Sequence, residues 1–236
     1  MTTTRKTRPP SPRTRVRRRS ARGAYDRATI HAILDEGLIA HVGFATPDGQ
    51  PFVMPMLYGR DGDTLLLHGS PASRMLGSLR EGVAVCCTVT LLDGIVLARS
   101  AFHHSMNYRS VVVLGTAQAV EDEPAKRAAL DAIVEHVLPE RTADARGPNA
   151  KELRATLVLG LPLDEASAKV RTGPPADVAA DMELPVWAGE LPLRLTPGDP
   201  VPDPAAPFEV PVPATVARYA RGAGSGGSAG AAAAAR

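Results

Sequence analysis

Two Asp-Gly pairs between apolar runs constrain the fold of this chain more strongly than any other feature. The runs that they separate are LIAHVGFA (38–45), PFVMPMLY (51–58) and TLLLHG (64–69). Asp48-Gly49 and Asp61-Gly62 are strong signals for tight β-hairpins, because these residues tolerate the backbone conformation that such turns require. The three runs therefore predict an antiparallel meander, which argues against a parallel nucleotide-binding sheet.

Further strands and a few helices complete the prediction. The expected strands are 83–92, which turns at Asp93-Gly94 into 95–98, then 110–122 and 155–163; the expected helices are 25–36, 71–80 and 123–138. Pro55 within the run 51–58 favours an edge strand or a bulge, since proline cannot donate to a ladder. Six or more antiparallel strands with a few short helices predict a mainly β protein, built as a small closed or half-open barrel.

The stretch SAFHHSMNYRSVVVLG (100–115) gathers polar chemistry just ahead of a buried strand. Its candidate functional residues are His103, His104, Asn107, Tyr108, Arg109 and Ser110. Arg109 offers a planar fork of donors, and Tyr108 adds a flat apolar face with a polar tip. This set suits an anionic, partly aromatic ligand. The alternative is a barrel strand with a polar connection, in which the histidines are surface or capping residues.

A second candidate site lies where a strand turns into a helix, in HGSPASRMLGSLR (68–80). Gly69 and Ser70 form the corner, and Ser73 and Arg74 lie in the first helical turn. Free backbone N–H groups, hydroxyls and an arginine at a helix start make an anion site. The alternative is a plain Ser-Pro helix cap with a solvated Arg74.

The formal net charge of +2 hides a strong asymmetry. The first 22 residues hold nine of the 27 basic residues and no acid, and three more basic residues lie near the C-terminus. The rest of the chain holds the remaining 15 basic residues and all 25 acidic residues, so its formal net charge is about −10. Because phosphate contacts dominate nucleic-acid affinity, we expect no specific nucleic-acid partner. The basic segment has the composition of a solvated tail, with non-specific contact to nucleic acid or anionic lipid as the alternative.

Composition divides the chain into four parts. We expect a disordered basic arm (1–24), a barrel domain (25–195), a proline-rich extended strap (196–221) and a flexible Gly/Ala/Ser tail (222–236). Half of the 22 prolines fall between Pro174 and Pro213, which disfavours a packed subdomain there. Trp187, the only tryptophan, either pins the proline-rich segment down or covers a ligand ring.

The cellular compartment is inferred from what the sequence lacks. No stretch reaches 18 uninterrupted apolar residues, and no apolar segment follows the basic N-terminus as in a signal peptide, so we expect a cytoplasmic protein without a membrane span. An organelle transit peptide is the weaker alternative. Cys86 and Cys87 would point to opposite faces of a strand, so we expect reduced thiols. No metal site is predicted, since His103 and His104 lack the spacing of paired ligands.

Five motifs occur in an order that resembles one known family. They are PFVMPMLY, LHGSPASRM, DGIVLARSAFHHSMNYRSVVVLG, EASAKVRTGPP and VWAGELPL. They resemble the FMN-binding split-barrel proteins, and most of all the pyridoxamine 5′-phosphate oxidase-like or flavin-nucleotide-binding branch, near the nitroimidazole reductases. The resemblance covers about residues 25–195.

The resemblance implies a six-stranded antiparallel split β-barrel, usually a homodimer with two FMN sites at the interface. It implies that the strand-to-helix corner carries the FMN phosphate and that the strand at Met54 to Leu57 lies along the flavin ring. The residues implied in FMN binding, some of them from the partner subunit, are Met56, Leu57, His68, Gly69, Ser70, Ser73, Arg74, Asn107, Tyr108, Arg109, Ser110 and Trp187. Lys169 and Arg171 are placed near the pocket mouth. The substrate-phosphate residues of true pyridoxamine phosphate oxidases are not recognisable, so vitamin B6 oxidation is not expected.

The leading functional hypothesis is an FMN-dependent oxidoreductase. It would pass electrons from NAD(P)H to a small oxidised substrate, such as a nitro-aromatic or quinone-like compound. His68 and His104 are candidate proton donors, and no catalytic residue is assigned. Two alternatives remain open: a non-catalytic flavin-binding protein, and a haem-binding or haem-degrading split barrel that uses His68, His103 or His104.

Overall fold

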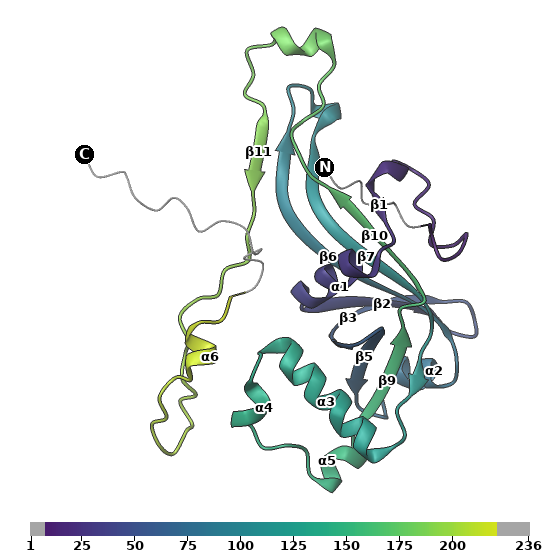
Figure 1. Ribbon diagram of the computed structural model, residues 1–236, viewed down its shortest axis with the longest axis vertical. Helices are drawn as coiled ribbons and strands as arrows, with labels where there is room; N and C mark the ends of the chain where they lie inside the picture. The colour runs from purple at the N-terminus through teal and green to yellow at the C-terminus, as the bar shows by residue number, and fades with distance from the viewer. Residues whose placement is uncertain (1–7, 221–236) are drawn as a thin grey trace.

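The computed structural model describes residues 8–220 of the 236-residue chain. Its strands form two antiparallel sheets that share one core (Figure 1). The first sheet has the strand order β1-β10-β7-β6-β2-β3, with β11 paired to β6, and the second has the order β4-β5-β9-β8. The prediction of a mainly β protein with a few helices, an antiparallel split barrel, is confirmed.

The bounds of the elements show how the number of strands differs from six. The first sheet contains β1 (Gly23–Ala24), β2 (Ile39–Ala45), β3 (Pro51–Leu57), β6 (Ala84–Leu97), β7 (Ser105–Thr116), β10 (Glu165–Arg171) and β11 (Gly189–Pro192). The second sheet contains β4 (Gly59–Asp61), β5 (Thr64–Gly69), β8 (Gln118–Ala119) and β9 (Leu157–Pro162). The six strands expected from the sequence are β2, β3, β5, β6, β7 and β9, and the described residues add five more, of which β10 is the longest.

Short helices close the ends and one outer face of the sheets. The α-helices are α1 (Arg27–Glu36), α2 (Arg74–Arg80), α3 (Glu123–Val137), α4 (Arg141–Asp144), α5 (Ala150–Arg154) and α6 (Ala214–Ala217). Single 3₁₀ turns occur at Ser20–Arg22, Ala101–His103 and Ala179–Glu183. Asp26 caps α1 and Asp122 caps α3, each accepting a hydrogen bond from a backbone N–H in the first turn.

The core lies between the inward faces of the two sheets. β2 buries Ala40 and Val42 at alternate positions, as expected for a strand with one face inside. On the other side of the second sheet, α3 packs Ala129 and Ile133 against Leu66 of β5. β5 is therefore covered on both faces. Leu65 and Leu67 enter the core between the sheets, and Leu66 between them packs against α3.

The pairing of β6 with β7 corrects two expectations. The chain does not turn at Asp93-Gly94; β6 runs on through this pair with a bulge. The reason is that β11 pairs along the other side of β6, so the segment has strand partners on both edges. β7 begins already at Ser105, which places Asn107 to Ser110 within the strand and not ahead of it.

Residues 8–24 differ from the expected disordered arm. β1 pairs with β10, and the backbone N–H of Val16 donates to Tyr25 Oη at 2.9 Å. Arg13 forms an ion pair with Glu165. Basic composition predicts a solvated tail, whereas these contacts with residues far along the chain fasten the segment to the domain.

The C-terminal part follows β11 as an extended segment. Residues 193–213 form no helix or strand, and side chains such as Phe208 and Val210 are exposed. Residues 1–7 of the expected arm and the expected tail, 222–236, lie outside the described residues. Within residues 8–220, none of the helices has the length and apolar character needed to cross a membrane.

Candidate functional site

β3 is an edge strand with an exposed apolar surface. It ends the strand order of its sheet, as the position of Pro55 predicts. Val53, Met54 and Leu57 are each about half exposed or more, while Met56 packs partly against the core. An exposed edge of this kind is a liability unless a ligand or another chain covers it.

The strand-to-helix corner lies between β5 and α2. Ser70 O accepts the N–H of Ser73 at 2.9 Å, and Ser70 Oγ accepts the N–H of Ala72 at 3.2 Å. Ser73 caps α2, its Oγ accepting from a backbone N–H. The turn packs closely, because a Cβ at Gly69 would lie 2.8 Å from Leu76 Cδ1 and the leucine side chain would have to shift. Both serine hydroxyls keep their own O–H for a ligand.

Arg74 joins this corner to the edge strand. Its guanidinium lies over the ring of Phe52 in β3, 5.3 Å from the centroid, and Phe52 in turn stacks on Phe44 at 5.6 Å. Among residues 8–220, no carboxylate forms an ion pair with Arg74. A cation with spare donors, two hydroxyls and an adjacent flat apolar edge fit a phosphate ester that carries an aromatic ring.

Within one chain, the segment from Asn107 to Ser110 does not reach this corner. The registers align Phe52 with Phe44, Val85 and Gly115 across the sheet. Tyr108 lies seven residues from Gly115 along β7, which corresponds to about 23 Å at ~3.3 Å per residue. The two groups of predicted site residues are therefore two separate clusters in the single chain.

Arg109 is engaged by two carboxylates and does not offer a free fork. Its Nε and Nη2 donate to Asp93 at 3.0 and 2.7 Å, and Nη1 and Nη2 donate to Glu36. The hydrogen bonds that Arg109 donates to Glu36, and then those that it donates to Asp93, raise the pKa of Arg109 further above its ordinary value. In the single chain, Arg109 ties α1 and the β6 bulge to β7, and its role toward an anion stays a prediction.

Asn107 belongs to a second buried polar group. Arg171, 7% exposed, donates to Asn107 Oδ1 and to Gly173 O, and Asn107 Nδ2 donates to Glu190 of β11. Burial, and then the charge of Arg22, lower the pKa of Arg171. Asn107 and Arg171 thus hold β11 in place, a role that no local signal in the sequence indicates.

The other predicted residues of this region also have structural partners. Ser110 Oγ donates to Lys169 O at 3.4 Å across the β7–β10 pair, and Tyr108 is half-buried opposite Arg171. Trp187 is 66% exposed, and its ring folds back over Gly189 at the start of β11.

His68 lies on the face of β5 that points away from the barrel interior. Leu65 and Leu67 enter the main core, whereas Leu66 packs under α3, and His68 follows this alternation. It lines a cavity of about 410 Å³ together with Leu130 and Ile133 of α3. Burial lowers its pKa, so the imidazole is neutral at pH 7. The expectation that His68 faces the flavin ring or the corner backbone does not match this placement.

The two adjacent histidines lie at the far end of the β6–β7 pair. His104 Nδ1 accepts the backbone N–H of Ala98 at 3.2 Å, which leaves the proton on Nε2. His103 packs edge-on against Phe102, with 5.2 Å between ring centroids. His104 is a capping residue of this turn, as the alternative reading of the sequence has it.

Comparisons with known proteins define the class of this fold and site. The family model for pyridoxamine 5′-phosphate oxidase matches residues 26–170. The chain belongs to this family of split-barrel proteins. A comparison with curated proteins finds no match.

Three solved structures are similar to this chain. The flavocytochrome Anf3 from Azotobacter vinelandii is 41% identical, with a TM-score of 0.84 over 90% of this chain and 99% of Anf3. An FAD and heme binding protein from Mycobacterium smegmatis is 38% identical, with a TM-score of 0.79 over 83% of this chain and 96% of its own. A protein from Bacteroides thetaiotaomicron described as a 5-nitroimidazole antibiotic resistance protein is 30% identical, with a TM-score of 0.53 over 63% and 86%.

Replacing Arg109 by alanine is expected to lower the free energy of unfolding by about 2 kcal/mol, because two part-buried carboxylates lose charge-assisted hydrogen bonds. Urea denaturation followed by circular dichroism measures this loss. The control is Arg80→Ala at the exposed end of α2, which should change stability by less than about 0.5 kcal/mol. If the Arg109→Ala variant is as stable as the native protein but does not bind flavin, Arg109 contributes to ligand binding and not to stability.

Proposed function

We propose that this protein binds FMN and works as an oxidoreductase that transfers electrons from NAD(P)H to a small oxidised substrate, such as a nitro-aromatic or quinone-like compound. The observation that carries the proposal is Arg74, held over Phe52 beside the exposed edge of β3 and without a carboxylate partner among residues 8–220. Membership of the pyridoxamine 5′-phosphate oxidase family and the flavin in the names of two similar structures support it.

Each part of the corner has a role in binding. Arg74 pairs with the phosphate, and the O–H groups of Ser70 and Ser73 donate to its remaining oxygens. The edge backbone of β3 offers hydrogen bonds to the polar rim of a flat ring, while Met54, on the same face of the strand as Phe52, excludes water from one side of the ring. A bound flavin would supply the two-electron chemistry, and the chain supplies position and electrostatics.

FMN is the flavin that this corner fits best. Its single terminal phosphate matches one arginine and two hydroxyls, whereas FAD, named for one of the relatives, carries a second phosphate and an adenosine. Steady-state consumption of NAD(P)H with a nitro-aromatic acceptor separates the oxidoreductase from a flavin-binding protein without turnover. We assign the protein to the cytoplasm, where the unpaired thiols of Cys86 and Cys87 stay reduced.

Arg74→Ala is expected to raise the dissociation constant for FMN at least about tenfold, because one charge-assisted contact to the phosphate is lost. Quenching of flavin fluorescence on binding measures the constant. Arg80→Ala, which removes an arginine from the other end of the same helix, is the matched control and should bind as the native protein does. Equal affinity of both variants would contradict the phosphate site.

We also propose that two copies associate and complete the site. The apolar side chains on the outer side of the β2–β3 edge, including Ile39 (52% exposed) and Val53 (64% exposed), need a cover. A second copy would also bring its own Asn107 to Ser110 segment within reach of the corner, which one chain does not do.

Sedimentation velocity at micromolar concentration is expected to show a dimer that Val53→Glu shifts toward the monomer, because a buried charge opposes association. Gln50→Glu, in the exposed turn just before β3, is the control and should remain dimeric. A native monomer that binds FMN tightly would contradict this part of the proposal.

Haem binding is a second candidate function, because the similar Anf3 is a flavocytochrome and the M. smegmatis protein binds haem. In this chain, His68 suits an axial ligand best: its imidazole is kept neutral by burial and lines a cavity of about 410 Å³. His104 suits it poorly, since Nδ1 accepts a backbone hydrogen bond and leaves Nε2 protonated.

Titration of the purified protein with haem should give a Soret band that His68→Ala abolishes and His104→Ala retains. The band reports axial coordination directly and does not depend on turnover. A titration without a bound-haem band, or one in which His68→Ala behaves as the native protein, would contradict the haem assignment.

A further inference from the structure

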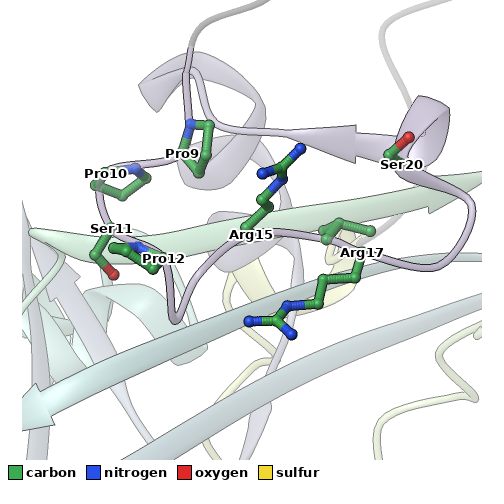
Figure 2. Close-up of a pocket in the computed structure, with 8 residues that line it drawn as sticks. Pro9, Pro10, Ser11, Pro12, Arg15, Arg17 and Ser20 are labelled. Atoms are coloured by element: carbon green, nitrogen blue, oxygen red, sulfur yellow. The ribbon is translucent and has the colours of Figure 1, made fainter.

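The N-terminal arm lines a cavity of about 650 Å³ that is open to solvent (Figure 2). The residues that line it are Pro9, Pro10, Ser11, Pro12, Arg15, Val16, Arg17 and Ser20. Figure 2 shows Arg15 extending into the space between Pro9 and Ser20, while the guanidinium of Arg17 points to the other side of the segment. The walls thus combine an apolar surface of prolines with the guanidinium of Arg15 and the hydroxyl of Ser20.

Internal contacts hold this segment in a defined shape. Thr14 is 4% exposed, and its Oγ1 donates to Ser11 O at 2.9 Å. The backbone N–H of Val16 donates a hydrogen bond to Tyr25 Oη. The N–H of Arg22 donates to the carbonyl of Arg19 at 2.9 Å, and Arg19 has a left-handed backbone conformation. The arginines of the arm are therefore presented by folded backbone and not by a solvated tail.

Positive charge accumulates on the arm without local compensation. Residues 8–22 contain seven arginines and no acid. Within the described part of the chain, Arg13 alone among these seven has a carboxylate partner, Glu165. Holding like charges together is unfavourable, and a bound anion would offset it.

Ser20 supplies the hydroxyl of this cavity that a ligand can reach, because its side chain is exposed. The hydroxyl oxygen of Ser11 also has no hydrogen-bond partner among residues 8–220, but it is buried and therefore shielded from a ligand in the cavity.

We propose that this arm cavity binds a nucleotide that carries two or more phosphate groups. Arg15 holds a phosphate with its planar fork, Arg17 adds positive charge from the other side of the segment, and Ser20 donates a hydrogen bond. The base lies against the proline surface, and the volume lies within the range of small-molecule pockets. β1, which anchors the arm, and β3, which borders the flavin corner, are at opposite ends of the sheet order, so the two sites are distinct.

Isothermal titration calorimetry of the flavin-loaded protein tests this proposal with ADP, AMP and adenosine as probes. We expect ADP to bind more tightly than AMP, and AMP more tightly than adenosine. Arg15→Ala should weaken ADP binding about tenfold, the loss of one charge-assisted contact, and Arg17→Ala less. Arg18→Ala, which removes an exposed arginine just outside the cavity, is the matched control and should leave the affinity unchanged within about twofold.

Three results would overturn the proposal. ADP that binds no more tightly than adenosine would remove the phosphate site. Equal losses in the Arg15→Ala and Arg18→Ala variants, or a single-stranded RNA that binds more tightly than ADP with a steep salt dependence, would identify a general polyanion surface instead. Arg15→Lys keeps the charge without the fork and should bind with intermediate affinity, so the test does not rely on the alanine variant alone.

Discussion

The antiparallel pairing of β6 with β7 is the framework on which the other elements depend. β2 and β11 pair with β6, and β10 pairs with β7, so both edges of the framework are used. Its bulge brings Asp93 to Arg109, and Arg109 also binds Glu36 at the end of α1. These ion pairs stabilise the arrangement, because separating them would leave part-buried carboxylates without a partner for their charge. Arg109 thereby adds an ionic link between α1, the β6 bulge and β7 to the strand pairing and the apolar packing of α1.

One edge of the first sheet is β3, where the candidate site lies. The sheet order ends there, the strand carries exposed apolar side chains, and α2 places Arg74 over Phe52 at the same edge. An open apolar edge beside an available cation is costly in the isolated chain. A phosphate-bearing aromatic ligand, together with a second copy of the chain, would cover what the framework leaves uncovered.

Features that depend on neighbouring residues could be predicted from the sequence. The Asp-Gly hairpins form as expected, with φ of 87° at Gly49 and 51° at Gly62, because only local backbone preferences decide them. Pro55 marks the edge strand for the same local reason. A corner between strand and helix is expected from the same short-range chemistry, but α2 begins at Arg74 with Ser73 as its cap, three residues after the expected start at Pro71.

Features that depend on distant partners could not be predicted. Asp93-Gly94 reads as a turn, but β11, nearly a hundred residues later, pairs along this segment and keeps it extended. Arg109 reads as a ligand for an anion, because Glu36 and Asp93 become its neighbours only after folding. The face on which His68 lies depends on strand register, and a shift of one residue would reverse it.

The most direct test of the account is an absorption spectrum of the freshly purified protein, with the released chromophore identified by its mass. The account predicts a two-band flavin spectrum and release of FMN. An added Soret band would bring in the haem candidate beside the flavin. A colourless protein that takes up no flavin on titration would contradict the central claim that the Arg74 corner and the β3 edge form a flavin site.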